Sequence, residues 1–163
     1  MATFVLVHGA WHGGWCWQRV AKLLRARGHD VSTPTLTGVC ERSHLLSPAI
    51  DLNTHINDIA NLIKWNELAN VVLVGHSYGG MVISGVAEKS EKAIGSFVML
   101  DAFYPENGES LMDQTVQASR DAVKEAAAKG DIPFRSVRQC PSWSMCEMST
   151  GSIASARRNR SRR

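Results

Sequence analysis

Val71-Val-Leu-Val-Gly75-His-Ser77-Tyr-Gly79-Gly-Met-Val-Ile83 is the stretch that decides the fold. Four apolar residues precede a Gly-x-Ser-x-Gly motif, and a second apolar run follows it. The first run suits a strand buried in a parallel sheet, and the second has the spacing of a buried helix. A turn this tight needs small residues two positions before and after the serine, and glycine stands at both. The stretch therefore predicts a strand, a sharp turn and a helix.

Further strands and helices alternate on both sides of this stretch. Apolar runs predict strands at residues 3–8, 31–36 and 97–100, the second weakened by Pro34. Helical spacing predicts helices at residues 17–24, 52–63 and 110–129. Strands and helices that alternate in this way predict a mostly parallel sheet with helices on both faces.

The ends and faces of these helices also carry signals. Gly28 and Gly130 are expected helix stops, and Ser110 with Asp113 is an expected capping pair. In the 52–63 helix, the polar residues fall largely outside the apolar stripe: His55, Asn57 and Asp58. We therefore expect them on the polar side of an amphipathic helix.

Ser77 is the candidate nucleophile, because a turn between strand and helix holds a serine side chain clear of the sheet. Attack on a carbonyl also needs donors for the negative charge that develops on the substrate oxygen. Two backbone N–H groups are candidates: that of Tyr78, at the start of a helix, and that of Ala10, in the loop leaving the first strand. The plainer interpretations are a serine that joins two elements and, at His8-Gly9, an ordinary turn.

Several separated motifs together resemble the small-esterase and hydroxynitrile-lyase branch of the α/β-hydrolases, which includes plant methyl esterases and bacterial relatives. The resemblance covers about the first 135 residues. The motifs are Phe4–Trp17, Gly28-His29, Pro34, Glu41–His44, Gly75–Gly80 and Leu100–Pro105. The resemblance implies an α/β-hydrolase fold and a cofactor-free hydrolase of small carboxylic esters, with an acyl-enzyme on Ser77 and an apolar pocket under a helical cap.

The resemblance also bears on the pocket and on the reaction. It implies that Trp11 and Phe103 face the pocket, although plain core packing explains each equally well. Lyases of this branch carry threonine where Gly9 stands, so Gly9 favours ester hydrolysis over cyanohydrin cleavage.

The histidine that would act as general base is missing from its expected place. In the hydrolase order an acid and then a histidine follow the serine, whereas all six histidines here precede Ser77. The ring of His76 should point away from Ser77, and His12 and Asp101 are expected to be structural or pocket-lining. Without a base, acyl transfer should slow by several orders of magnitude.

Residues 136–163 differ from the rest of the chain. They hold seven Ser and a net charge of +5, whereas the first 135 residues carry −2 of the overall +3. We therefore expect two regions. Residues 1–135 form the N-terminal part of an α/β-hydrolase domain, incomplete at its C-terminus, with a cap beginning near residue 104. Residues 136–163 form a basic Ser/Arg-rich tail that is disordered or out of frame. The competing interpretation of the tail is a basic arm for nucleic acid or an acidic membrane surface.

Composition sets the remaining expectations. The 163 residues are 44% hydrophobic and 20% charged, which suits one soluble domain. No apolar run approaches the roughly 20 residues of a membrane span, and the start lacks a leader pattern, so we expect a cytoplasmic protein. The cysteines match no metal motif and are expected to be free thiols: Cys16, Cys40, Cys140 and Cys146.

The predicted function is a serine hydrolase of small-molecule esters, impaired because the family's Asp and His are missing. We expect no cofactor, no metal, no nucleic acid and no membrane as partner, and we expect self-association through the unpaired sheet edge at 97–100. Two alternatives stay open. One is an inactive fragment or pseudo-enzyme that binds small apolar ligands, and the other is a hydroxynitrile lyase.

Overall fold

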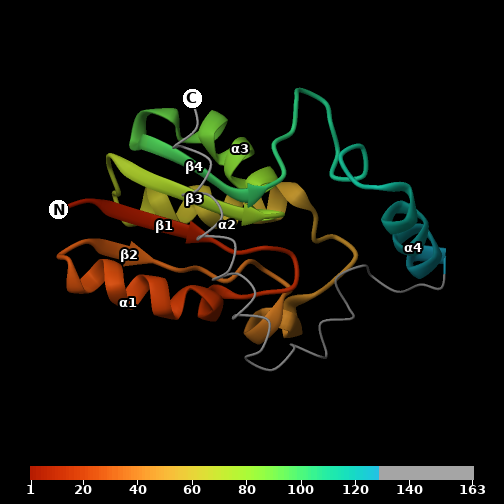
Figure 1. Cartoon of the computed structure of the whole chain (residues 1–163), viewed down its shortest axis with the longest axis horizontal. Helices are drawn as coiled ribbons and strands as arrows, with labels where there is room; N and C mark the ends of the chain where they lie inside the picture. Colours follow the sequence, from red (N-terminus) through yellow and green to blue (C-terminus); the bar gives the residue numbers. More distant parts are fainter. Residues whose placement is uncertain (129–163) are drawn as a thin grey trace, which may run out of the picture.

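Four parallel strands form one sheet in the order β2-β1-β3-β4 (Figure 1). The computed structural model describes residues 1–128, so Gly130 and the tail 136–163 lie outside the described residues. The strands are β1 (Thr3–Val7), β2 (Asp30–Ser32), β3 (Val71–Ser77) and β4 (Ile94–Ala102). The predicted parallel sheet is confirmed, and β3 and β4 are longer than predicted.

The strand order reverses beside β1. The chain passes from β1 outward to β2, and then returns to the other side of β1 to form β3. In the register, Thr3 pairs with Asp30 on one side, and Val7 pairs with Gly75 on the other. Open α/β sheets bind ligands outside the carboxyl ends of the strands at such a reversal. The fold therefore directs attention to the ends of β1 and β3.

Helices cover both faces of the sheet, as predicted (Figure 1). Side chains alternate along a strand: Val5 of β1 joins the large core formed with α2 and α3, whereas Leu6 packs on the opposite face with Trp17 and the apolar residues of α1. The helices are α1 (Gln18–Ala26), α2 (Leu52–Trp65), α3 (Gly79–Lys89) and α4 (Gln117–Ala128). Short 3₁₀ turns are η1 (Gly14–Trp17), η2 (Cys40–Leu45) and η3 (Glu91–Ala93).

The strand predicted at 31–36 was wrong in its second half, because β2 ends at Ser32, two residues before Pro34. Proline has no N–H to donate to a neighbouring strand. The residues after it bond to side chains instead of to a strand. The Leu36 N–H donates to His8 Nε2 at 3.0 Å, and the Thr37 N–H donates to Asp58 Oδ2 at 2.7 Å. This segment therefore becomes a connector between β1 and α2.

The helix predicted at 110–129 was wrong at its start, because α4 begins at Gln117. Ser110 does bond to Asp113, with N–H···Oδ2 at 2.8 Å, but the pair closes a turn and not a helix. Arg120 reaches back and donates to the backbone carbonyls of Asp113 and Thr115, both at 2.8 Å. These carbonyls are thus satisfied without helical bonds, and α4 lies apart from the sheet (Figure 1).

β4 pairs with β3 along one side, and within residues 1–128 no strand pairs with its other side. Phe97 and Val98 point to opposite faces and remain 37% and 40% exposed.

Within residues 1–128, no helix is long and apolar enough to cross a membrane. Cys16 and Cys40 form no disulfide there, whereas Cys140 and Cys146 lie outside the described part.

Candidate active site

Ser77 is the last residue of β3 and adopts the left-handed conformation, with φ of 52°. A non-glycine residue in this region is strained, and such strain gathers at functional sites. The flanking glycines explain how the turn is made. A Cβ on Gly75 would lie 2.6 Å from the carbonyl oxygen of Gly79, and one on Gly79 would lie 2.8 Å from that of Val7. Only glycine at both positions lets α3 start so close to the ends of β3 and β1.

The peptide that joins Ser77 to Tyr78 is held by its carbonyl. The Phe103 N–H, just beyond β4, donates to the Ser77 carbonyl oxygen at 3.1 Å. In a trans peptide the N–H points opposite to the C=O, so this bond also fixes the direction of the Tyr78 N–H. Tyr78 caps the start of α3, where the helix dipole favours negative charge.

The peptide that joins Gly9 to Ala10 is held in the same manner by a buried histidine. His8 Nε2 accepts from the Leu36 N–H at 3.0 Å, so the proton of the neutral ring is on Nδ1, which donates to the Gly9 carbonyl oxygen at 2.8 Å. Burial lowers the pKa of His8 from 6.5 to about 4, so the ring is neutral at pH 7. Sequence reasoning missed this role of His8.

The loop after β1 lies directly against the nucleophile turn. A Cβ on Gly9 would be 3.1 Å from Ser77 Cβ and 3.2 Å from His76 Nδ1. Ala10 is half-buried against the main core, and so is Phe103, whereas Trp11 is 45% exposed. The structure thus brings the Ala10 loop and Phe103 to Ser77, and that Trp11 and Phe103 line a pocket stays a prediction.

The ring of His76 faces a set of aromatic rings on the α1 side of the sheet. It lies edge-on to Trp17 and to His12, with centroid distances of 6.4 Å and 6.2 Å. Burial lowers the pKa of His76, and the charge of Asp101 opposes that shift. The pKa of His12 is lowered by burial and, to a smaller extent, by His76. Within residues 1–128, which include all six histidines, no hydrogen bond joins a histidine to the Ser77 hydroxyl.

The polar residues of α2 do not all lie on its outer side, so that prediction was wrong for two of them. His55 is 2% exposed and contacts Tyr78, and Asp58 is half-buried and bonds to Thr37. His55 stands four residues before buried Ile59, a spacing that could have placed both on one helix face. Asn57 is exposed, as predicted.

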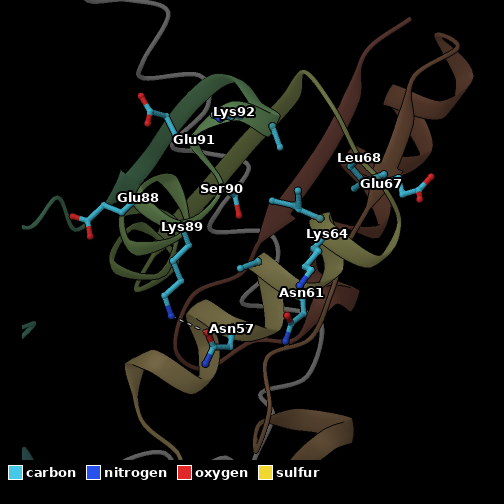
Figure 2. A pocket seen from close by; sticks show the side chains of 13 residues that line it. Asn57, Asn61, Lys64, Glu67, Leu68, Glu88, Lys89, Ser90, Glu91 and Lys92 are labelled. Atoms are coloured by element: carbon cyan, nitrogen blue, oxygen red, sulfur yellow. Dashed lines mark hydrogen bonds between the residues drawn. The ribbon is translucent and has the colours of Figure 1, made fainter.

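A hollow of about 620 Å³ lies at the end of the sheet opposite to Ser77, between the C-terminal parts of α2 and α3 (Figure 2). Lys89 reaches across it and donates to Asn57 Oδ1 at 2.8 Å, while Glu88 and Glu91 point outward (Figure 2). Its lining reaches the residues just before β3 and β4 begin, whereas Ser77 stands where β3 ends. Within residues 1–128 no cluster of three or more His, Cys, Asp or Glu could hold a metal ion.

Comparisons with known proteins agree on the family. Residues 4–159 match the alpha/beta hydrolase family. A carbendazim hydrolyzing esterase from Nocardioides sp. (strain SG-4G) is 59% identical over 112 residues, which are 69% of this chain and 46% of that protein. Methylesterase 1 from Arabidopsis thaliana is 38% identical over an alignment of 118 positions, which covers 66% of this chain and 41% of that protein.

The solved structures give the same result. An extracellular alpha/beta-hydrolase from a Paenibacillus species, described as sharing structural and functional homology with tobacco Salicylic Acid Binding Protein 2, has a TM-score of 0.75 and 29% identity. The similarity covers 91% of this chain and 64% of that one. This chain spans less than half the length of the two curated relatives named above. From motif, fold and relatives together, the chain belongs to the alpha/beta hydrolase family, and it is similar to a carbendazim hydrolyzing esterase and to plant methylesterases.

Proposed function

We propose that this chain carries the nucleophile and the oxyanion donors of a serine esterase for small carboxylic esters. The observation that supports the proposal is the placement of Ser77: a strained residue at the junction of β3 and α3, against the Gly9-Ala10 loop and beside the strand-order reversal. Ser77 Oγ attacks the ester carbonyl, and the N–H groups of Ala10 and Tyr78 donate to the oxygen that becomes negative. The alcohol leaves, and water then releases the acid from the acyl-enzyme.

The proton of the Ser77 hydroxyl needs an acceptor in this reaction. His8 and His55 already use both ring nitrogens in other bonds, and His76 turns toward Trp17. With no histidine bonded to Ser77 among residues 1–128, we expect turnover several orders of magnitude below that of an intact triad. The two peptide N–H donors would still give a residual rate above that of water.

Hydrolysis of a short p-nitrophenyl ester by the purified chain and by Ser77→Ala tests the proposal. Carbendazim is the second substrate to try, since the 59% identical relative is named for hydrolysing it. We expect slow hydrolysis by the parent chain, falling in Ser77→Ala to the rate that the two peptide N–H donors support by themselves. Equal rates for the two proteins would contradict a role for Ser77.

An inactive pseudo-enzyme that binds small apolar ligands is the second candidate, and the position of all six histidines before Ser77 favours it. A fluorophosphonate probe separates the two. Labelling that is lost in Ser77→Ala indicates an activated serine, whereas no labelling of either protein indicates an inactive site.

Hydroxynitrile lyase activity is the third candidate, and Gly9 disfavours it. There is little room at this position for the threonine of the lyases, because a Cβ on Gly9 already lies 3.1 Å from Ser77 Cβ. A cyanide-release assay with a cyanohydrin substrate tests this candidate, and we expect no release above the background reaction.

A further inference from the structure

His55 of α2 bonds to the residue that follows the nucleophile. Its Nδ1 lies 2.9 Å from the Tyr78 hydroxyl oxygen, and its Nε2 lies 2.9 Å from the carbonyl oxygen of Thr37. The rings of His55 and Tyr78 also meet edge to face, with centroids 5.7 Å apart and an interplanar angle of 81°. Both side chains are buried, 2% and 6% exposed.

The direction of these two bonds follows from the chemistry of the groups. A carbonyl oxygen only accepts, so His55 Nε2 carries the proton and donates to Thr37. Burial lowers the pKa of His55, so the ring is neutral at pH 7 and its Nδ1 can only accept. The Tyr78 hydroxyl therefore donates to Nδ1, and burial raises the pKa of Tyr78, which keeps this proton in place.

The chain of bonds connects the oxyanion peptide to two distant elements. The Tyr78 side chain is fixed through His55 to α2 and, beyond it, to the segment at Thr37. Thr37 is itself held, because its N–H and its hydroxyl donate to the two carboxylate oxygens of Asp58 at 2.7 Å and 2.8 Å. The Ser77 carbonyl is held separately by the Phe103 N–H. The backbone of residues 77 and 78 is thus restrained from two sides.

We propose that His55 is a positioning residue that holds the Tyr78 N–H in the direction required of an oxyanion donor. The inference rests on the proposed function, since Tyr78 is a donor only if Ser77 is a nucleophile. Both ring nitrogens of His55 are used in the bonds to Tyr78 and Thr37, so neither is available to a substrate oxygen. It acts through the Tyr78 side chain, and the gain comes from a donor that needs no reorganisation when charge develops.

Two substitutions test the bond and two serve as controls. Tyr78→Phe removes only the hydroxyl, and His55→Leu removes both ring nitrogens. His55→Gln keeps one N–H donor and one oxygen acceptor and should rescue the arrangement. Thr54→Ala removes half of the capping box at the start of α2, which loosens the helix without removing a side-chain hydrogen bond of His55 or Tyr78.

The first readout is the hydrogen exchange rate of the backbone amide at position 78, measured by NMR. The same spectra report which His55 ring nitrogen carries the proton. We expect Tyr78→Phe and His55→Leu to speed this exchange at least about fivefold, the factor that corresponds to one net hydrogen bond. His55→Gln should stay within about twofold of the parent chain. Equal exchange in Tyr78→Phe and the parent chain, or an equal increase in Thr54→Ala, would overturn the proposal.

The second readout is ester hydrolysis, in which loss of a positioned donor lowers kcat and leaves KM unchanged. The two readouts test the proposed function and the role of His55 separately. A parent chain without any Ser77-dependent hydrolysis contradicts the proposed function, while the amide exchange still decides whether His55 holds the Tyr78 peptide.

Discussion

At the scale of single residues, the site depends on buried groups that must stay uncharged. His8 is fully buried, with one ring nitrogen bonded to the Gly9 carbonyl and the other to the Leu36 N–H. A second proton on the ring would replace the acceptor for the Leu36 N–H with a donor and would bury a charge. The geometry of the Ala10 loop therefore requires neutral His8.

Acid should destabilise the chain through His8. The folded pKa of about 4 lies below the unfolded value of 6.5, so between these pH values the unfolded state binds more protons. The contribution of neutral His8 to the free energy of unfolding is therefore fully present above about pH 6.5. It is lost as the pH decreases toward 4, by about 3 kcal/mol in all. Urea unfolding at several pH values measures the slope.

Matched variants isolate the contribution of His8. His8→Gln cannot titrate and should show a shallower pH dependence over the same range. The exposed His44→Gln should keep the slope of the parent chain. Identical slopes for the parent chain and His8→Gln would contradict the assignment.

Gly9 is predicted to set the space around the nucleophile. Gly9→Ala places a methyl group 3.1 Å from Ser77 Cβ and 3.2 Å from His76 Nδ1, so one of these side chains must move. We expect a loss of about 1–3 kcal/mol in the free energy of unfolding and a shifted NMR signal of the His76 ring. Gly108→Ala is the control for the NMR signal alone: its added Cβ would meet no atom within 4 Å and should leave the His76 signal in place, although its φ of 84° gives alanine a strain of its own. An unshifted His76 signal in Gly9→Ala would argue against this packing.

At the scale of elements, the start of α3 packs against the end of β1 through backbone atoms. A Cβ on Gly79 would lie 2.8 Å from the Val7 carbonyl oxygen and 2.9 Å from that of His8. Backbone atoms of a central strand cannot yield as a flexible side chain can. This contact between α3 and β1 therefore helps to set the position of the turn that holds Ser77.

Gly79→Ala is expected to destabilise the protein although alanine is the better helix former. Helix propensity alone would favour the change by at most about 1 kcal/mol, the value for a helix interior, since Gly79 is the first residue of α3. The contact with β1 should reverse that sign and give a net loss of about 1–3 kcal/mol. Chemical unfolding measures it, with exposed Glu88→Ala on the same helix as a control expected within about 0.5 kcal/mol of the parent chain. A stabilised Gly79→Ala would refute the close approach.

At the scale of the whole molecule, the β4 side of the sheet is exposed within the part of the chain that the structure describes, residues 1–128. Phe97 and Val98 leave apolar surface on both faces of β4, and α1 packs mainly beside β2. An unpaired strand edge with apolar side chains is a template for another chain. We therefore expect the chain to associate with itself through β4.

Sedimentation over a range of protein concentrations tests this association. The parent chain should sediment faster as its concentration rises. Val98→Lys places a charge on the exposed strand and should shift the equilibrium toward monomer without changing the circular dichroism spectrum. Monomeric behaviour of the parent chain at all concentrations would exclude this use of the edge.

Local patterns in the sequence determined the strand, turn and helix around Ser77 and the alternation of strands and helices. These are decided by neighbours in the chain, because apolar spacing sets the buried face and the glycines permit the turn. The same patterns gave wrong results at 33–36 and at 110–116, where side chains such as His8 and Arg120 satisfy the backbone in place of regular structure.

Tertiary structure alone decided how the site is supported. It placed β1 beside β3 and brought the Gly9 loop against Ser77. It also buried His55 against Tyr78, and it bonded Leu36 to His8 and Thr37 to His55. The residues joined by these hydrogen bonds are 18 to 28 positions apart in the sequence, which is farther than any local periodicity extends. They form only when the sheet and α2 pack together, because a buried polar group without a partner costs free energy.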